Sequence, residues 1–410
     1  MEPSRRSGCG PRPTPSRAAR PRSCWRSSRA ASLGCRDSAV VSLLPTEDEI
    51  ILADSARSFL DEVAPVSRLR AMRDAGQGHD HDLWQDMSKL GWAGVLIPKA
   101  AGGADMGYAA ANILSFEMGK TLAVSPFIST SVIAATVLRQ LRTDRANRRL
   151  TEIAKGDLVY ALAFDGAPKH LQNTPDVMAR PSRDGFLLSG PKTLVMEGGV
   201  ADRLLVSTKV KYGYAVFDIA ATQTGLSSSP MNLIDGRDAV RLGFKDVWVS
   251  KDDLCGEIDQ EEPILKRALL AGYAAVAAEL SGIAAGVFAL TIAYLKDRQQ
   301  FGRPIGSFQA LQHRVAHLWC EMEVTASTIL NAGRMLDSDP DNADLAVSLA
   351  KVRAIRTARL AVGEAIQMHG GIGMTDALDL GFYMKRARVA SEWLGDESYH
   401  TERVAQLRGL

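Results

Sequence analysis

The 410-residue sequence has little of several features that mark particular classes of protein. It contains five cysteines and seven histidines, and its 49 lysines and arginines nearly balance its 47 acidic residues. After the first 45 residues, no block of basic residues with interleaved aromatics occurs, so we expect no nucleic-acid partner. No apolar run reaches the roughly 18 residues that a membrane span needs, so we expect no membrane span.

The cysteines give no sign of a metal centre. Three of them lie in the first 45 residues, and the other two, Cys255 and Cys320, have apolar neighbours and no metal-ligand spacing. We predict that Cys255 and Cys320 are buried thiols and that the chain binds no metal. The apolar content of 46% and the charged content of 23% are typical of a globular protein in a reducing, aqueous compartment, which favours the cytoplasm.

Residues 1–43 differ in composition from the rest of the chain. The first 45 residues contain nine arginines but only two acidic residues, Glu2 and Asp37. Such a segment cannot form a core, so we predict a disordered basic extension. An Arg-rich, Ser-rich and acid-poor segment is also typical of an organelle transit peptide, which would direct the chain to the mitochondrial matrix. Because no clear amphipathic stripe is present, an unstructured arm or an extended gene start is an equal alternative.

The remaining chain divides into three blocks. Residues 44–157 show helical spacing, and the "TEDE" that begins at Thr46 predicts a capping box with Glu49. Residues 158–256 contain short β-branched and aromatic runs separated by turn residues, which predicts a sheet. In "AVRLGFKDVWVS", Leu242 and Phe244 share one face and Val247 and Val249 share one, as in a half-buried strand with a small irregularity.

Residues 257–410 are helical again. In "SFQALQHRVAHLWCEMEVTASTILNAGRML", apolar residues recur in alternating steps of three and four, and Ser307 is placed to cap the helix. Together the blocks predict an α+β fold with an N-terminal helical domain, a middle sheet domain and a C-terminal helix bundle. We expect the bundle to associate with a second subunit.

Four stretches of the sequence resemble the acyl-CoA dehydrogenase family, from about Leu44 to the C-terminus. "LPTEDEIILADSARSFLDEVAP" resembles the opening helix of the family, and "LIPKAAGGADMGY" its first glycine turn. "RLGFKDVWVSKDDLCGE" matches the last sheet segment, while "DRQQFGRPIGSFQALQH" and "AIQMHGGIG" match the two C-terminal flavin motifs. The last two are the most specific.

The residues of the first flavin motif suit the binding of a dinucleotide. Pro304 prevents a helix from continuing, and Gly302 and Gly306 free the backbone. Arg298 then lies at a helix end beside an aromatic residue, Phe301, and a guanidinium next to a flat ring suits a diphosphate attached to a ring system.

The resemblance implies FAD as cofactor and α,β-dehydrogenation of an acyl-CoA thioester as the reaction. A carboxylate with a raised pKa removes the α-proton while the β-hydrogen leaves as hydride to the flavin. Electrons then pass to an electron-transfer flavoprotein, and the subunits form a dimer of dimers. His369 is expected to be a packing residue rather than a ligand or base. The residues implied to reach FAD, much of it held by a neighbouring subunit, are Arg298, Gln300, Phe301, Ile305, Phe308, Leu311, Gln367, Gly370 and Gly371.

The sheet domain departs from the family pattern. The family usually has a Thr-Glu-Pro turn and a Gly-Ser-Asp loop that line the flavin, followed by a Trp-Ile-Thr segment against its ring. This chain has "LAFDGAPKHLQ" in the first place and "GPKTLVMEGG" in the second, so Leu194, Val195 and Met196 occupy the Trp-Ile-Thr positions. Apolar side chains can still cover a ring, but the hydroxyl hydrogen bonds are lost.

The position of the catalytic base departs as well. The basic run in "KRARVASEWLGDE" places Leu394 where the family has its glutamate, and Lys266 stands at the alternative position of the base. One interpretation is that Asp396 replaces the base. The other is a heteromeric dehydrogenase, in which this chain contributes flavin contacts and a partner subunit brings the base. Glu392 and Glu397 are expected to be solvated charges. A scaffold without flavin and a flavin oxidase of the same fold are further alternatives.

Overall fold

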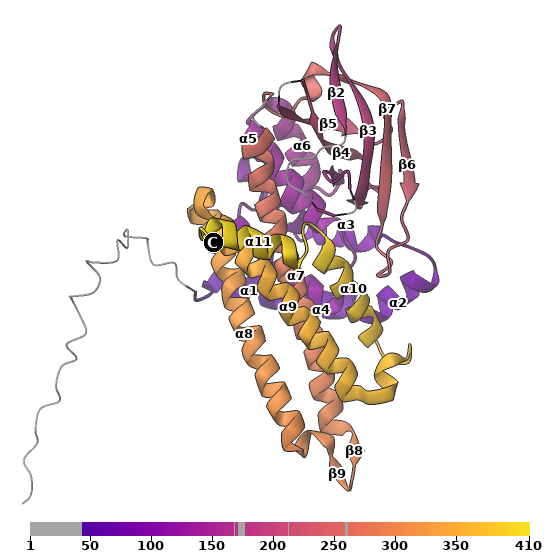
Figure 1. Cartoon of the computed structure of the whole chain (residues 1–410), viewed down its shortest axis with the longest axis vertical. Helices are drawn as coiled ribbons and strands as arrows, with labels where there is room; N and C mark the ends of the chain where they lie inside the picture. Colours follow the sequence, from indigo (N-terminus) through magenta and orange to yellow (C-terminus); the bar gives the residue numbers. More distant parts are fainter. Residues whose placement is uncertain (1–42, 168, 171–176, 212, 259–260) are drawn as a thin grey trace, which may run out of the picture. The chain divides into compact units, whose positions relative to one another are not determined.

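The computed structural model describes residues 43–410 except 168, 171–176, 212 and 259–260, and the side chains of 261–263 are not described (Figure 1). The predicted basic extension, residues 1–43, therefore falls almost wholly outside the described residues. The described residues form one compact unit. Its helices and strands follow one another as helices, then sheet, then helices, which confirms the predicted α+β fold class. The individual domain boundaries stay predictions.

Helices build the first part of this unit. The predicted capping box is present, because Thr46 Oγ1 accepts the backbone N–H of Glu49 and the Glu49 carboxylate accepts that of Thr46. A π-helix, η4, continues directly into α5. The helices are α1 (Glu47–Val63), α2 (Val66–Asp74), α3 (His81–Lys89), α4 (Gly107–Thr121), η4 (Ile128–Ala134), α5 (Ala135–Leu141) and α6 (Asp144–Ala154).

A seven-stranded sheet follows, in the order β1-β4-β2-β3-β7-β6, with β5 paired to β4. Strands β1 and β4 are parallel, whereas β3 pairs antiparallel with β7. Asp246 has φ 48°, and this irregularity keeps Leu242, Phe244, Val247 and Val249 all buried, as predicted. The strands are β1 (Tyr160–Ala163), β2 (Met178–Ser182), β3 (Gly185–Met196), β4 (Arg203–Lys209), β5 (Tyr214–Ala220), β6 (Leu226–Pro230) and β7 (Ala239–Ser250).

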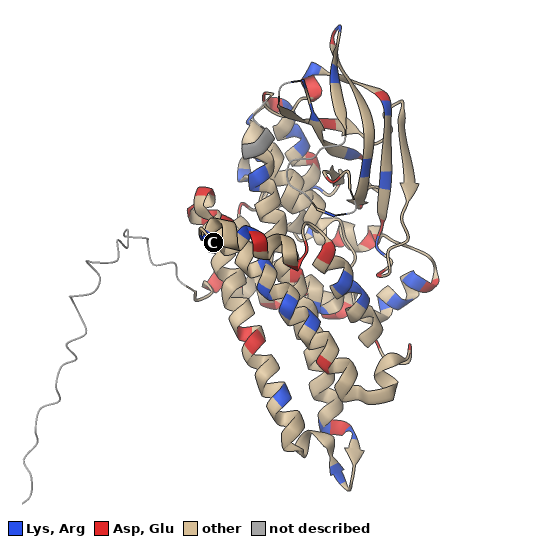
Figure 2. Cartoon of the chain, viewed as in Figure 1, with Lys and Arg blue, Asp and Glu red and all other residues tan. Residues whose placement is uncertain are grey.

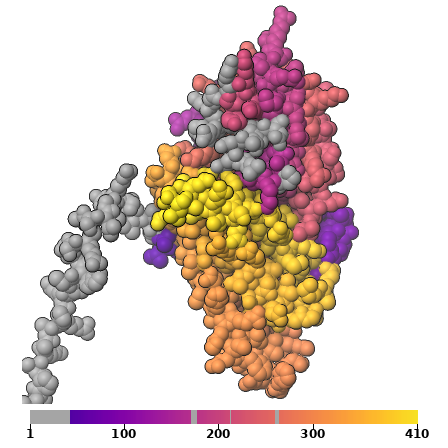
Figure 3. Space-filling model, viewed as in Figure 1, coloured from indigo at the N-terminus to yellow at the C-terminus, as the bar shows by residue number. Residues whose placement is uncertain are grey.

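The third part is a bundle whose central helix, α7, packs against α4, α9 and α8. A two-stranded hairpin, β8–β9, links α7 to α8 at the end of the bundle away from the sheet (Figure 1). In the space-filling view the C-terminal segment, in yellow, lies on the surface between the bundle and the sheet (Figure 3). The elements are α7 (Glu261–Asp297), β8 (Gln299–Gln300), β9 (Arg303–Pro304), α8 (Gln309–Ser338), α9 (Asp344–His369), α10 (Leu380–Glu392) and α11 (Glu397–Leu407).

Three expectations from the sequence need correction. Cys255 is buried, but Cys320 is exposed on α8, because the apolar stripe of that helix faces the other way. Ser307 does not cap α8; its hydroxyl donates to the carbonyl of Pro304 at 2.7 Å. The stretch Ile264–Asp297 is long and apolar enough to cross a membrane, yet 72% of its most apolar window is buried inside the protein. Its apolar surface is therefore used by the core.

Candidate functional site

The first flavin motif forms the hairpin after α7. The backbone N–H of Arg298 donates to Tyr294 O at 2.8 Å, and that of Ile305 donates to Arg298 O at 2.8 Å, which closes the turn. Phe301 and Gly302 both have positive φ, 55° and 76°, so the hairpin tip projects the Phe301 ring outward. That ring is 89% exposed, which is unusual for a large apolar side chain unless another molecule covers it.

The hairpin brings together the six residues predicted for this motif. Phe301 and Phe308 meet edge to face with ring centroids 6.1 Å apart, and the guanidinium of Arg303 lies 4.1 Å from the centroid of Phe308. This contact with Arg303 was not expected from the sequence. All six predicted residues are exposed or half-buried, so they form an outward-facing surface: Arg298, Gln300, Phe301, Ile305, Phe308 and Leu311.

The second flavin motif lies at the end of α9. Gln367, Gly370 and Gly371 are exposed, and a Cβ added at either glycine would meet no described atom within 4 Å. His369 is buried and its Nδ1 lies 2.7 Å from the carbonyl of Ala365, consistent with a packing role. Its ring stacks on Tyr294, with centroids 4.2 Å apart. Tyr294 therefore joins the two motifs, since its carbonyl also anchors Arg298.

These two motifs fit one part of an FAD molecule. Exposed arginine donors suit a diphosphate, an exposed ring suits stacking, and open glycine backbone permits close approach. The residues of both motifs that would contact the cofactor are exposed or half-buried in this chain. The individual cofactor contacts stay predictions.

The segment at the Trp-Ile-Thr positions ends strand β3. Leu194 has φ 50° and is half-buried, while Val195 and Met196 are buried. The backbone N–H of Thr193 donates to Asp165 O at 2.8 Å, which ties this segment to the one predicted to line the flavin. Part of that lining segment, 162–172, lies outside the described residues.

A buried network that sequence reasoning missed adjoins this segment. His170 bridges Asp165, 3.0 Å from its Nδ1, and the Tyr273 hydroxyl, 2.9 Å from its Nε2. Tyr273 Oη lies 3.4 Å from Tyr399 Oη, and burial raises the pKa of both phenols. The network joins the segment after β1 to α7 and α11. Residues so far apart in sequence carry no local motif that would have indicated it.

The base position is apolar and rigidly held. Leu394 is 4% exposed with φ 58°, and its carbonyl lies 3.0 Å from His400 Nε2. Lys351 Nζ donates to the carbonyls of Ala390 and Trp393, each at 3.0 Å. At the alternative base position, Lys266 pairs with Asp344 at 2.8 Å. Neither family position offers a carboxylate.

Asp396 has the environment of a helix cap. Its Oδ1 accepts the backbone N–H of Tyr399 at 2.9 Å, and its Oδ2 accepts from Lys169 Nζ at 2.5 Å. Burial raises the pKa of Asp396, but Lys169 and the backbone N–H groups lower it more, so it falls below its ordinary value. A base that must hold a proton needs the opposite shift. Catalysis by Asp396 stays an untested prediction with this geometry against it.

The two neighbouring glutamates are ion-paired rather than simply solvated. Glu392 pairs with Lys169 and Arg388, and Glu397 with Arg356 and Arg359. These pairs lie at the surface, where each contributes little to stability. Neither carboxylate is enclosed in a dry pocket.

A carboxyl with a raised pKa does occur elsewhere. Glu197 directly follows the Leu194–Met196 segment and is fully buried, and burial raises its pKa to about 7. It belongs to a cluster of buried charged side chains with Asp235, Arg237, Glu279 and Arg386. The only sequence signal was a glutamate placed after an apolar strand end.

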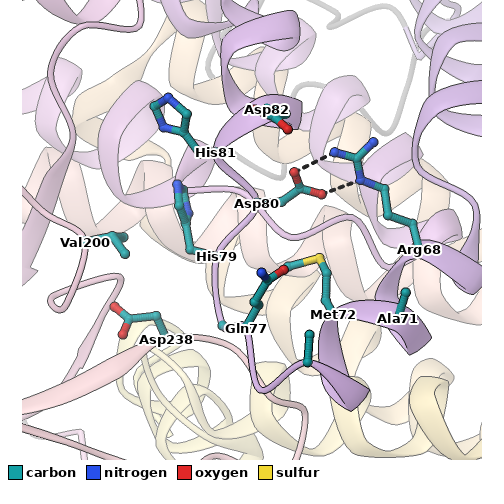
Figure 4. Close-up of a pocket in the computed structure, with 12 residues that line it drawn as sticks. Arg68, Ala71, Met72, Gln77, His79, Asp80, His81, Asp82, Val200 and Asp238 are labelled. Atoms are coloured by element: carbon teal, nitrogen blue, oxygen red, sulfur yellow. Dashed lines mark hydrogen bonds and ion pairs between the residues drawn. The ribbon is translucent and has the colours of Figure 1, made fainter.

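A surface pocket of about 660 Å³ lies between the α2–α3 loop and the sheet (Figure 4). Arg68, Asp80 and Asp238, which line it, interact with other groups of the protein. Arg68 and Asp80 form a two-pronged ion pair at 2.6 and 2.7 Å, and Asp80 also caps α3. Asp238 accepts the backbone N–H of Gly199 at 2.7 Å. Burial lowers the pKa of His79, which keeps it neutral. None of the residues predicted for cofactor or catalysis lines this pocket.

Comparison with known families gives matches over most of the chain. The model of the acyl-CoA dehydrogenase N-terminal domain matches residues 46–157, and that of the acyl-CoA dehydrogenase C-terminal domain matches residues 263–407. Acyl-CoA dehydrogenase IpdE2 of Mycobacterium tuberculosis is 29% identical over 356 residues, covering 86% of this chain and 94% of the relative. The caffeyl-CoA reductase-Etf complex subunit CarC of Acetobacterium woodii is 25% identical over 343 residues, covering 80% and 89%.

Solved structures with the same fold cover nearly the whole chain. The Tcur3481-Tcur3483 steroid ACAD has a TM-score of 0.79 at 29% identity, covering 88% of this chain and 98% of that chain. The ChsE4-ChsE5 complex of Mycobacterium tuberculosis has a TM-score of 0.83 at 23% identity, covering 90% and 99%, and shows the fold alone.

Proposed function

We propose that this chain, which belongs to the acyl-CoA dehydrogenase family, is one subunit of a heteromeric FAD-dependent acyl-CoA dehydrogenase. In this proposal it supplies flavin contacts through the hairpin after α7, and a partner subunit brings the catalytic carboxylate. The observation that carries the proposal is the buried Leu394 at the base position. An aliphatic side chain cannot accept a proton.

The state of the remaining carboxylates supports a base from outside the chain. Asp396 is tied to the α11 N-terminus and Lys169, so moving it to a substrate would break two hydrogen bonds. Hydrogen bonds to charged groups are worth about 1.5–3 kcal/mol each. Glu197 has a suitable pKa but is enclosed with Arg237 and Glu279. Asp396 is the alternative base within this chain.

The flavin motifs support a role in holding FAD. FAD supplies the acceptor for the β-hydrogen when it is bound. Arg298 would donate to the diphosphate, Phe301 and Phe308 would pack against a ring, and the backbone at Gly370 and Gly371 would allow close contact. Leu194 and Met196 would exclude water from the side of the ring that a hydroxyl-bearing segment usually contacts.

The bundle surface supports association with another subunit. Charged side chains are sparse along α8 (Figure 2). Trp319 is 50% exposed, Val324 51% and Phe301 89%, so large apolar side chains are open to a partner on this part of the bundle. The related steroid ACAD is itself a Tcur3481-Tcur3483 pair, and CarC is a subunit of a reductase-Etf complex. We propose a hetero-oligomer through the C-terminal bundle, with a homo-oligomer as the alternative.

We propose an acyl-CoA thioester as substrate, an electron-transfer flavoprotein as electron acceptor and the cytoplasm as location. Relatives that act on acyl-CoA and a steroid ACAD support the substrate class. The buried state of the most apolar helix supports an aqueous compartment.

Co-expression with candidate partner subunits tests the proposal. The chain alone should show no acyl-CoA oxidation with a dye acceptor, and the complex should oxidise acyl-CoA and contain FAD. Arg298→Ala should lower the FAD content of the complex. Lys296→Ala, which removes another exposed cation in the last turn of α7, should leave FAD content unchanged.

Asp396→Asn separates the two interpretations. Asparagine can still cap α11, so the fold should persist while the carboxylate is lost. Full activity of the chain alone that is abolished by Asp396→Asn and preserved in Glu397→Gln would overturn the heteromer proposal. An active complex in which Asp396→Asn has no effect supports it.

A further inference from the structure

Five charged side chains are buried together where the three parts of the fold meet. Glu197 directly follows strand β3, and Asp235 and Arg237 lie in the loop before β7. Glu279 comes from α7 and Arg386 from α10. Each of the five residues is at most 7% exposed. Charges buried to this degree are retained only when they are paired or neutralised.

Four of the five charges balance one another. Arg237 Nε pairs with Asp235 Oδ2 at 2.8 Å, and Arg386 Nε lies 3.1 Å from the same oxygen. Both guanidiniums also reach Glu279 Oε1, at 3.4 Å from Arg237 and 3.2 Å from Arg386. Two cations thus neutralise two carboxylates. Glu197 is the third carboxyl, and its Oε2 accepts a short hydrogen bond from Ser129.

Glu197 can lose its proton near neutral pH. Burial raises the pKa of Glu197 to about 7, against the opposing effects of Arg237 and Ser129. Arg237 and Arg386, by contrast, hold the pKa of Asp235 below its ordinary value despite burial. The charged groups that act on the pKa of Glu197 are Arg237, Asp238 and Glu279. Asp235 pairs with Arg237, and Arg386 pairs with Glu279. Burial also lowers the pKa of Lys351, which interacts with Glu279 and Arg237, to about 7.

A small cavity of about 20 Å³ is lined by Glu197, Arg237 and Glu279, among others. That space holds about one water molecule. Two polar atoms of residues lining it, Arg237 Nη2 and Glu279 Oε2, have no hydrogen-bond partner among the described residues. A donor and an acceptor without such partners therefore belong to residues that line the same cavity as Glu197.

We propose that Glu197 is a buried proton-binding site that exchanges partners when its proton leaves. With its proton, Glu197 donates through one water in the cavity to Glu279 Oε2. Without it, the carboxylate accepts from Arg237 Nη2, and Arg237 turns away from Asp235. The proton leaves to solvent, and no other covalent bond is made or broken.

The movement of Arg237 reaches the base-position loop. Its guanidinium carbon lies 5.6 Å from the ring centroid of Trp393, the residue before Leu394. Trp393 is 5% exposed, so its ring senses Arg237 more than solvent. Loss of the Glu197 proton should therefore change the contact between the sheet and the Trp393–Gly395 loop. This proton exchange at Glu197 does not depend on which subunit provides the catalytic base.

Fluorine NMR of the whole chain labelled with 5-fluorotryptophan tests the switch. Trp393→Phe assigns the signal of Trp393. We expect this signal to shift between pH 5.5 and 8.5 with a midpoint of about 7, as burial sets for Glu197. In Glu197→Gln, which resembles the protonated carboxyl in shape, the shift should disappear. Glu62→Gln, at an exposed position of α1, should keep it.

The competing source of such a shift is Lys351, which donates to the Trp393 carbonyl. A midpoint that persists in Glu197→Gln and disappears in Lys351→Gln would overturn the proposal, as would a signal that does not move with pH. Thermal unfolding of each variant shows that it is folded. None of these outcomes bears on the heteromer, which is tested by FAD content and dye reduction.

Discussion

Replacing Glu197 by glutamine should raise the free energy of unfolding by about 3 kcal/mol at pH 8 and by about 1 kcal/mol at pH 5. In the folded chain, burial raises the pKa of Glu197 from an ordinary value of 4.5 to about 7. That difference in pKa corresponds to about 3 kcal/mol, because each pKa unit is worth about 1.4 kcal/mol.

The sign follows from which state binds the proton. Below pH 4.5 both the folded and the unfolded chain hold the proton, and the full stability is present. Between pH 4.5 and about 7 the unfolded chain releases it while the folded chain keeps it, so stability falls as pH rises. Above pH 7 the loss is complete. Glutamine has no such proton and accepts the same hydrogen bond from Ser129. The free energy of unfolding of the variant therefore does not fall between pH 4.5 and 7 for this reason.

Urea titrations of the whole chain at pH 5 and pH 8 measure the effect. Glu62→Gln is the matched control, because it removes the same charge at an exposed position of α1. Its free energy of unfolding should change by less than about 0.5 kcal/mol at both pH values. A gain in Glu197→Gln that is equal at pH 5 and pH 8, or a loss at pH 8, would refute the reasoning.

Three further outcomes are expected. Gly282→Ala should destabilise the chain by about 3 kcal/mol in urea titrations, because its Cβ would lie 2.0 Å from Phe116 O. In the control Gly381→Ala, the added Cβ meets no described atom within 4 Å, so the free energy of unfolding should not fall. The imidazole of His400 should stay neutral at pH 5 in nitrogen NMR, because burial lowers its pKa to about 3; a protonated ring at pH 5 would contradict this. Phe301→Ala should change the melting temperature of the chain by less than about 2 °C, since the ring is 89% exposed, and a larger loss would show that the ring packs within its own chain.

Local chemistry explains which parts of the fold were predictable. The Thr46 capping box, the end of α7 before Arg298 and the irregularity in β7 each depend on a few neighbouring residues, and all three are present in the structure. The α+β class followed from the same local patterns. The prediction that Ser307 caps α8 was wrong, because the chain turns at Pro304. The prediction that Cys320 is buried was wrong, because the packing of the whole bundle decides which side of α8 is covered.

The sequence by itself determined the family, the outward-facing flavin motifs and the absence of a carboxylate at Leu394, because each is a matter of residue type and local spacing. Only the tertiary structure decided the charge states. Lys169, more than two hundred residues away, helps lower the pKa of Asp396 despite burial. Helices and loops remote in sequence bury Glu197 and raise its pKa to about 7. A pKa depends on solvent and neighbouring charges in space, and folding places both.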